Sequence, residues 1–365
     1  MAKPFRIIDT GVREGRRNIA FDAALIELHK AGRIEDTIRF LQFTPTVLIG
    51  RHQALSREVM LGYCRANGIG LARRITGGGA LYMDSGQFGF ELVFHRAAFG
   101  ISSLGELARA VCEATAAGLN RLGIHARYRP RNDIEVDGRK ISGTGGFFDG
   151  DTLFYQGTVL MEMNAGRMLA ALNVPQEKLA KRELDSAEQR IVTLKELLGD
   201  AMPPASTVKQ ALVEEFANQF GIEPTWGAIS DQEEALADRL FKEEIGTDEF
   251  VWSIDDPDTG ADVRSSSQTR AGGTVTAYVR LEGEALDRIR EVLITGDFFV
   301  TPPRTILDLE ARLRGTPVLA VRKTVMNFFA EADVGLLSAQ PDDFADVIES
   351  ALAVPTGDKR ARTTV

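Results

Sequence analysis

Cysteine and histidine are scarce in this sequence, and their scarcity bears on the kinds of site it can build. The 365 residues include two cysteines and four histidines. Cys64 and Cys112 lie in helix-like stretches with small or apolar neighbours, so we expect reduced, structural thiols. The histidines are scattered without the spacing of metal ligands, which argues against a zinc site.

Long apolar runs are also missing. No run reaches the roughly 18–20 residues that a bilayer-spanning helix needs. The first residues, MAKPFRIIDTG, contain no signal-peptide h-region. We therefore expect a cytoplasmic protein without a membrane partner.

Positive charge is in the minority, with 43 Lys and Arg against 52 Asp and Glu and a net charge of −9. A general nucleic-acid binder needs a basic face to neutralise phosphates, so we expect no nucleic-acid partner. The segment 121–140 departs from this balance, with six basic residues against three acidic ones. Such an excess is usual in a solvated helix end and loop, but it could also serve an anion site.

The chain is long enough for two domains. Helical periodicity and strand-like runs alternate in its first two thirds, and the spacing predicts helices over 18–32, 56–70 and 103–123. A stretch rich in Gly, Ser, Asp and Thr at 255–273 predicts a linker or exposed loop. The domains we predict are a large N-terminal domain at 1–252, a linker at 253–273, a small C-terminal domain at 274–356 and a flexible tail at 357–365.

A run of three glycines stands between two strand-like segments in RRITGGGALYMD, residues 73–84. Glycine runs mark bends and bulges more often than phosphate sites. The spacing matches neither the GxGxxG dinucleotide motif nor the GxxxxGK[ST] phosphate loop. A turn without side chains can still bring backbone N–H groups close to an anion, and Arg73 and Arg74 directly precede it.

A lysine follows a tight Asp-Gly turn in RNDIEVDGRKISG, residues 131–143. A lysine on a strand is usually a solvated edge charge. If Lys140 instead faces a cleft floored by glycines, it can neutralise a carboxylate and an α-phosphate together, as acyl-adenylate formation requires.

These motifs occur in an order that resembles the lipoate–protein ligases, a family related to biotin protein ligases and octanoyltransferases. The segments that carry the resemblance are GRHQ (50–53), RRITGGGALYMD (73–84), RNDIEVDGRKISG (131–143), YQGTVL (155–160) and KLAKRELDSAEQRIVTLKELL (178–198). The resemblance covers about 5–200 and continues weakly to GDFF (296–299). It implies an α+β fold, with a mixed, largely antiparallel sheet flanked by helices and a small α+β C-terminal domain.

The resemblance also implies a reaction. Such ligases activate lipoate with ATP and Mg²⁺ to give lipoyl-AMP and pyrophosphate, and then transfer the lipoyl group to a lysine of a carrier protein. The implied partner is a lipoyl carrier: a lipoyl domain of a 2-oxoacid dehydrogenase, the glycine-cleavage H protein, or a lipoate-binding protein of sulfur oxidation.

Several positions of this sequence match functional positions of the family. Lys140 corresponds to the catalytic lysine that binds the acyl carbonyl and phosphate, and Arg73 to the arginine that lines the phosphate and carboxyl site. Asn132 and Asp133 would lie near the phosphate, with Asp133 a candidate magnesium ligand. The other residues expected to bind acyl-AMP are Gly77, Gly78 and Gly79 at the turn, Ala80, Leu81 and Tyr82 against adenine, and Ser142, Gly143, Gln156, Gly157 and Thr158.

Three motif positions depart from the family pattern. Met83 replaces a histidine, Gln87 replaces an asparagine, and Tyr155-Gln156 replaces a pair of histidines. Amides can replace hydrogen bonds but not proton transfer, so we expect catalysis to rest on positioning and charge neutralisation.

Two other functions are compatible with the motifs. An octanoyl or lipoyl transferase acts without ATP through a cysteine thioester, but Cys64 and Cys112 lie outside every motif. A non-catalytic acyl-binding relative is the second alternative, and the presence of Arg73, Asp133 and Lys140 argues against it.

Overall fold

The computed structural model describes residues 3–101, 103–173, 190–255, 260, 262–270, 273–337 and 339–354. The chain divides into two compact units. The first unit comprises Met1–Ile49, Glu58–Ile75 and Ala80–Val251, and the second comprises Gly50–Arg57, Thr76–Gly79 and Trp252–Val365. The second unit thus contains two short segments of the N-terminal half, which the sequence patterns do not indicate.

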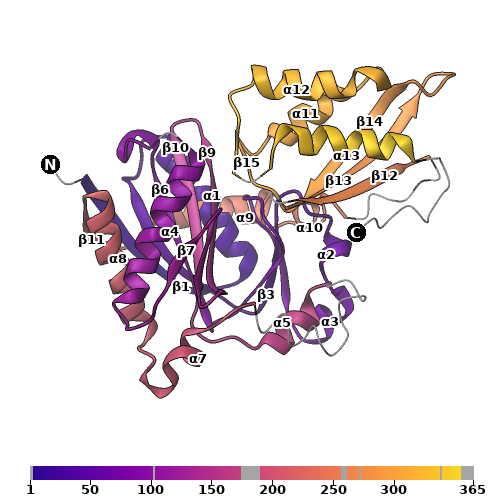
Figure 1. Ribbon diagram of the computed structural model, residues 1–365. Helices are drawn as coiled ribbons and strands as arrows, with labels where there is room; N and C mark the ends of the chain where they lie inside the picture. The colour runs from indigo at the N-terminus through magenta and orange to yellow at the C-terminus, as the bar shows by residue number, and fades with distance from the viewer. Residues whose placement is uncertain are drawn as a thin grey trace. The chain divides into compact units, whose positions relative to one another are not determined.

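An eight-stranded mixed sheet forms the centre of the first unit (Figure 1). In spatial order its strands are β11 (Ile222–Trp226), β1 (Lys3–Arg13), β2 (Thr37–Phe43), β6 (Gln87–His95), β10 (Thr152–Leu160), β9 (Arg139–Asp149), β8 (Asp133–Val136) and β7 (Arg127–Arg129). Strand β1 runs parallel to both of its neighbours, and all other pairs are antiparallel. The predicted mixed, largely antiparallel sheet is confirmed.

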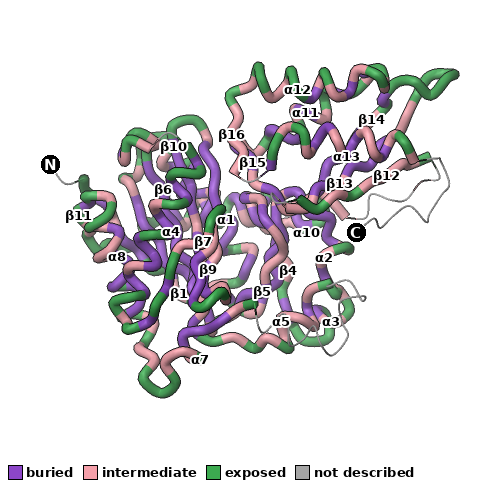
Figure 2. Tube along the Cα trace, in the orientation of Figure 1, coloured by how far each residue is buried: buried purple, intermediate pink, exposed green. Residues whose placement is uncertain are grey.

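Helices cover both faces of this sheet. On one face lies α1 (Gly15–Lys30), whose Asp22 is ion-paired with Arg39 of β2 in the core. On the other lie α4 (Leu104–Asn120) and α8 (Ala205–Phe220), and the Phe216 ring of α8 packs on Phe90 of β6. The central strands are accordingly almost entirely buried, as Figure 2 shows.

The remaining elements of the first unit are a small sheet and several helices, most of them short. A three-stranded sheet is formed by β4 (Gly70–Arg73), β3 (Thr46–Ile49) and β5 (Leu81–Met83). The other helices are α3 (Leu61–Ala66), α5 (Ala165–Ala171), α7 (Leu194–Leu198), α9 (Asp231–Glu243) and α10 (Asp248–Val251), with 3-10 turns at Arg96–Ala98 and Gly199–Ala201. None of the helices that the structure describes has the length and hydropathy to span a bilayer.

The helix predicted over 56–70 is wrong in its extent. The structure has α2 (Leu55–Glu58) and, after a break, α3. At the break Val59 forms a β-bridge with Leu172, and the Met60 N–H donates to the Ala171 carbonyl at 2.9 Å. These bonds to a distant segment replace the intrahelical ones, which helical periodicity alone does not reveal.

The second unit contains a three-stranded antiparallel sheet covered by helices, with the α+β composition predicted for the C-terminal domain. Its elements are β12 (Arg264–Arg270), β13 (Gly273–Glu282), β14 (Arg288–Gly296), the short pair β15 (Val300–Thr301) and β16 (Gly335–Leu336), helices α11 (Thr305–Leu313), α12 (Val321–Glu331) and α13 (Pro341–Ala353), and a 3-10 turn at Val318–Ala320. Phe298 and Phe344 meet edge to face in its core.

Strand β12 lies inside the segment predicted as a linker. Its sequence, RSSSQTR, lacks the apolar alternation typical of a half-buried strand. It pairs along its whole length with β13, and the Gln268 side chain donates to Ser350 of α13 at 2.8 Å. Hydrogen bonding rather than apolar burial therefore fixes this edge strand.

Candidate active site

The hairpin of β8 and β9 places the predicted catalytic lysine. Asp137 and Gly138 form its turn with φ angles of 51° and 80°, the backbone that Asp-Gly favours in a two-residue hairpin. The register then shifts, because Ser142 pairs with Ile134 whereas Lys140 pairs with Glu135. Ile141 is thus the extra residue of a β-bulge, a feature that redirects neighbouring side chains.

Lys140 is ion-paired with Asp133, the first residue of β8. Its Nζ lies 2.7 Å from Asp133 Oδ1, and the lysine side chain keeps about one third of its exposure. The other carboxylate oxygen of Asp133 contacts the Arg129 guanidinium. Burial alone would raise the pKa of Asp133, but the charges and hydrogen bonds of Lys140 and Arg129 outweigh burial and lower it. Asp133 is therefore a carboxylate held between two cations.

Gly143 provides the space in which the lysine side chain lies. A Cβ atom built on Gly143 would come within 2.5 Å of Lys140 Nζ and 3.4 Å of Asp133 Oδ1. Any other residue at this position would displace the lysine side chain.

The segment after residue 189 returns alongside Lys140. The Lys140 N–H donates to the Arg190 carbonyl at 2.8 Å, and Val192 N–H donates to the Lys140 carbonyl at 2.9 Å. Residues 178–189 of the motif segment KLAKRELDSAEQRIVTLKELL (178–198) lie outside the described residues. The last part of this motif segment, from residue 190, therefore runs beside Lys140.

The basic segment 121–140 is largely ion-paired. Arg121 contacts Glu214 at 2.6 Å, and Arg127 contacts Glu135 at 2.8 Å. Arg129, which the motifs do not single out, contacts Asp133. The local excess of positive charge is thus concentrated around Asp133, where Arg129 and Lys140 share one carboxylate.

Asn132 is bonded into β9. It hydrogen-bonds the Thr144 carbonyl through its side chain, and its own carbonyl accepts from the Thr144 N–H and hydroxyl at 2.8 and 3.0 Å. The Thr144 hydroxyl also lies 2.6 Å from the Tyr155 hydroxyl and 3.4 Å from Cys112 Sγ. The buried Tyr155, which stands at a family histidine position, thus supports the segment that carries Asp133.

Strand β10 divides the predicted residues between the two faces of the sheet. Gln156 pairs with Gly145 of β9, and Thr158 pairs with Gly89 of β6, so these half-buried side chains share one face with Gly143. Gly157 belongs to the opposite face, where an added Cβ would meet the Phe90 ring at 2.2 Å. Close packing therefore explains the glycine at 157.

Several buried polar side chains near the motifs, including Tyr82, Gln87 and Ser142, have unsatisfied atoms among the described residues. The Ser142 hydroxyl and both polar atoms of the Gln87 amide have no hydrogen-bond partner there. Gln87 lies on the same strand and face as Gly89 and pairs with Leu160. Such orphaned groups are rare in folded proteins and are typical of places where a ligand or water binds.

The two arginines before the glycine turn are buried. Arg73 donates from Nε and Nη2 to the Val251 carbonyl at 3.1 and 2.9 Å, which caps the end of α10. Arg74 donates to the Leu48 carbonyl at 3.0 Å, and burial lowers its pKa to about 10. Both arginines thus have backbone contacts, and the anion-binding role of Arg73 stays a prediction.

The residues predicted to face adenine continue into β5. Ala80 and Leu81 are half-buried, and Leu81 pairs with Leu48 of β3. Tyr82 is buried, and burial together with the Asp84 carboxylate raises its pKa to about 12. Its role toward adenine stays a prediction.

The glycine turn belongs to the second unit. Gly78 has a φ of 93°, and its N–H donates to the Phe298 carbonyl at 3.2 Å. A Cβ on Gly77 would lie 2.1 Å from that same oxygen. The turn therefore needs at least Gly77 and Gly78 for backbone geometry and close packing.

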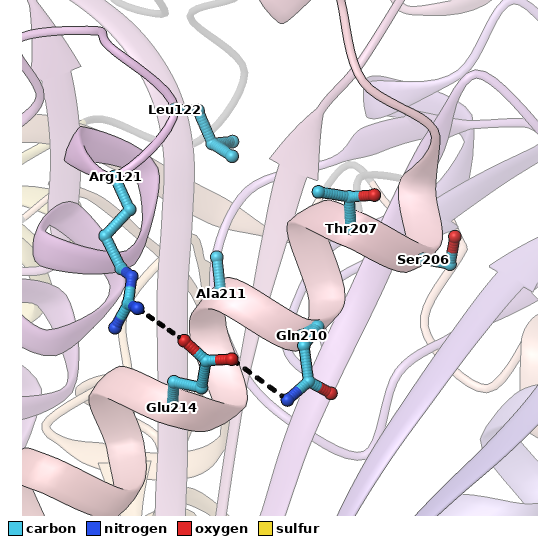
Figure 3. Close-up of a pocket in the computed structure, with 7 residues that line it drawn as sticks. All are labelled: Arg121, Leu122, Ser206, Thr207, Gln210, Ala211 and Glu214. Atoms are coloured by element: carbon cyan, nitrogen blue, oxygen red, sulfur yellow. Dashed lines mark hydrogen bonds and ion pairs between the residues drawn. The ribbon is translucent and has the colours of Figure 1, made fainter.

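A surface pocket of about 420 Å³ lies between the end of α4 and the first turns of α8 (Figure 3). It is lined by Arg121, Leu122, Ser206, Thr207, Gln210, Ala211 and Glu214. Glu214 is ion-paired with Arg121 and accepts from Gln210 at 3.1 Å. No predicted site residue lines this pocket, and its principal charges are already paired.

No group of three or more histidine, cysteine, aspartate or glutamate side chains that could hold a metal occurs among the described residues. Asp133 is a single carboxylate, and both of its oxygens contact cations. A lone carboxylate suits Mg²⁺ only where the phosphates of a bound nucleotide supply further ligands to the ion.

The mixed, largely antiparallel sheet flanked by helices matches the architecture of solved lipoate ligases. Residues 14–217, more than half of the chain, match the model of the lipoyl protein ligase A/B catalytic domain, and the chain belongs to this family.

Relatives of both activities are similar to the chain. Lipoate-protein ligase A subunit 1 of Thermoplasma acidophilum is 29% identical over 64% of this chain and 91% of its own length. Lipoate-protein ligase LplJ of Bacillus subtilis is 30% identical over 54% of this chain, but the match spans only 57% of the ligase. Octanoyltransferase LipM of Brevibacillus brevis is 26% identical over 67% of this chain and 98% of its own length.

Solved structures share the fold. The bipartite lipoate protein ligase of T. acidophilum, described with its E2 lipoyl domain, has a TM-score of 0.62 at 26% identity and covers 71% of this chain and 100% of its own. Lipoate-protein ligase A bound with ATP has a TM-score of 0.61 at 26% identity, covering 70% and 100%. P. falciparum LipL1 in complex with lipoate has a TM-score of 0.71 at 17% identity, covering 95% and 99%, which shows the fold alone.

Proposed function

We propose that this protein is an ATP-dependent lipoate–protein ligase. In the first step a lipoate carboxylate oxygen attacks the α-phosphorus of ATP, the bond to the β-phosphate oxygen breaks, and lipoyl-AMP and pyrophosphate form. In the second step a carrier lysine amine attacks the lipoyl carbonyl carbon. An amide forms, AMP leaves, and the amine loses its proton to solvent.

The pairing of Lys140 with Asp133 is the observation that carries this proposal. An anionic phosphate or carboxylate can replace Asp133 as the partner of Lys140. Asp133 then keeps its contact with Arg129, so no carboxylate is left without a counter-ion. Asp133 holds the lysine in place over Gly143 before the substrates bind, and such preorganised charge is what a reaction between anions needs.

The other predicted residues complete this assignment. Gly77, Gly78 and Gly79 would present backbone to the acyl-phosphate, with Arg73 lining it, and Ala80, Leu81 and Tyr82 would face the adenine. Gln156 and Thr158 share a sheet face with Gly143, and their half-buried side chains suit contacts with the acyl group. Mg²⁺ would enter with the nucleotide and draw on Asp133 as a single carboxylate ligand.

The burial of both cysteines favours the ligase over the thioester-forming transferase. Cys64 and Cys112 are 1% and 0% exposed. Burial raises the pKa of both thiols, to about 12 for Cys112. A nucleophilic thiol needs an accessible thiolate, and neither position provides one.

A lipoyl carrier is the proposed partner, because a ligase of this family must meet a protein lysine in its second step. The similarity to the T. acidophilum ligase, whose structure is described with its E2 lipoyl domain, supports a lipoyl domain as the first carrier to test. The H protein and a lipoate-binding protein of sulfur oxidation complete the panel.

Intact-protein mass spectrometry of these carriers tests the proposal. Each carrier is incubated with the protein, lipoate, ATP and Mg²⁺, and a lipoyl mass gain on one lysine is expected only when ATP is present. A parallel reaction contains octanoylated carrier as donor, an unmodified carrier as acceptor and no ATP. Transfer in that reaction would identify the octanoyltransferase instead, and lipoate binding without any mass gain would identify a non-catalytic relative.

A further inference from the structure

Two motif segments of the N-terminal half are bonded to the GDFF segment within the second unit. The Gly78 N–H donates to the Phe298 carbonyl at 3.2 Å, and Gly296 N–H donates to the His52 carbonyl at 3.0 Å. Gly77 approaches the Phe298 carbonyl so closely that a Cβ would lie 2.1 Å from it. The glycine turn and GRHQ therefore share one backbone anchor.

The same two segments also contact each other. The Arg51 N–H donates to the Thr76 carbonyl at 2.8 Å, and a Cβ on Gly50 would lie 1.9 Å from the Gly78 carbonyl oxygen. In addition, the His52 ring stacks on the Phe298 ring, with centroids 5.1 Å apart and planes at 20°. A shift of Phe298 would thus be transmitted to the glycine turn by two routes, its carbonyl and its ring.

Phe298 is itself fixed by the core of the second unit. Its side chain is fully buried, and its ring meets Phe344 of α13 edge to face at 5.2 Å. The neighbouring Asp297 donates its N–H to the Thr274 carbonyl at 3.2 Å, and its carboxylate accepts the Thr274 N–H. The position of the Phe298 carbonyl is therefore set by β13 and α13.

We propose that Phe298, through its carbonyl and its stack with His52, is a positioning residue that sets the conformation of the glycine turn. The proposal rests on the proposed function in one respect, the role of this turn in binding the acyl-phosphate. Misplacing the turn should impair the first step, formation of acyl-AMP, more than the transfer of a supplied acyl group.

Hydrogen–deuterium exchange of the peptide over 74–82 in the ligand-free full chain is the first readout. His52→Ala removes the stack and should speed exchange of this peptide about three- to tenfold. His52→Phe keeps an aromatic ring and should restore the slow exchange. Gly77→Ala places a Cβ against the Phe298 carbonyl and should speed exchange further.

The two steps of the reaction are the second readout. His52→Ala should raise the KM for ATP in pyrophosphate release while leaving transfer from supplied lipoyl-AMP to the carrier near the wild-type rate, and His52→Phe should restore the KM. Gly77→Ala should lower pyrophosphate release about 10²-fold, because small displacements of a reacting group have effects of this size. Leu319→Ser, at a fully exposed position of the same unit, is the matched control that should change neither readout.

The outcomes separate this proposal from the proposed function. Unchanged exchange in His52→Ala and Gly77→Ala overturns the anchoring of the turn. Faster exchange with an unchanged first step, or with equal losses in both steps, overturns the positioning role. Faster exchange in the variants together with a wild-type protein that releases no pyrophosphate overturns the proposed function, and leaves the anchoring of the turn intact. If Gly77→Ala does not fold, Phe298→Leu, which keeps most of the apolar volume, replaces it in both readouts.

Discussion

Lys140 Nζ and Asp133 Oδ1 lie 2.7 Å apart, in a space that is open only because residue 143 is a glycine. The lysine lies over Gly143, and the bulge at Ile141 sets its direction. Arg129 fixes the far side of the Asp133 carboxylate. A charged pair positioned in this way can exchange one partner for a substrate without rebuilding the strands around it.

Replacing the lysine should remove the first step of the reaction and keep the fold. Lys140→Ala loses one ion pair that is partly exposed, and such pairs contribute little to stability. The loss of a preorganised charge should lower pyrophosphate release on the order of 10²–10³-fold. Lys30→Ala, which breaks the exposed ion pair with Asp149, is the matched control and should keep activity. Near-normal pyrophosphate release by Lys140→Ala would remove Lys140 from the mechanism.

Filling the space beneath the lysine should have a milder effect. Gly143→Ala puts a Cβ within 2.6 Å of the Lys140 Cε, at the flexible end of that side chain, so the fold can adapt while the amine moves. We expect a melting temperature close to that of the wild type and pyrophosphate release reduced about tenfold or more. Gly105→Ala, where an added Cβ meets no atom within 4 Å, is the control. Full activity of Gly143→Ala would show that the exact placement of the amine is unimportant.

Local chemistry explains what the sequence could predict. The Asp-Gly dipeptide specifies the hairpin turn at 137–138, and this turn brings Lys140 onto a strand next to small residues. Runs rich in β-branched and aromatic residues predict strands of the main sheet, and the mixed, largely antiparallel architecture that the family resemblance implies is confirmed. These features depend on residues that are neighbours in the chain.

The features that escaped prediction depend on distant segments. The contact of the Arg73 guanidinium with the last carbonyl of α10 is one of these features. Gly77 is needed because the Phe298 carbonyl approaches it. The helix expected over 56–70 breaks where Met60 bonds to Ala171. In each case the partner is a backbone carbonyl far along the chain, which leaves no pattern in the sequence around the residue.

Removing both thiols should leave the reaction intact. In the double variant Cys64→Ser, Cys112→Ser each hydroxyl can use the contact of the sulfur it replaces, the Ala171 carbonyl or the Thr144 hydroxyl. We expect lipoyl transfer near the wild-type rate and a loss of about 1–3 kcal/mol in the free energy of unfolding for each buried hydroxyl. Circular dichroism confirms the fold, and carrier mass spectrometry measures transfer. A folded variant without transfer would revive the thioester mechanism.

The last prediction concerns the pH dependence of the second unit. Glu310 of α11 accepts the Ile294 N–H of the edge strand β14 at 2.7 Å. Burial raises the pKa of this carboxyl to about 7, and the hydrogen bond from Ile294 only partly opposes the shift.

A carboxyl with a raised pKa holds its proton in the folded state and loses it more readily on unfolding. Its contribution to stability is therefore complete below about pH 4.5 and is lost as the pH rises to about 7. Glu310→Gln cannot titrate, and its amide oxygen can still accept the Ile294 N–H. We expect the unfolding free energy of the variant, relative to that of the wild type, to rise by on the order of 1–3 kcal/mol between pH 5 and pH 8. Melting temperatures of both proteins over this pH range measure the change. Glu284→Gln, at an exposed position of the same unit, should show no such trend. A difference between Glu310→Gln and the wild type that stays constant over this range would mean that Glu310 is ionised in the folded protein throughout, and that β14 is held by a carboxylate.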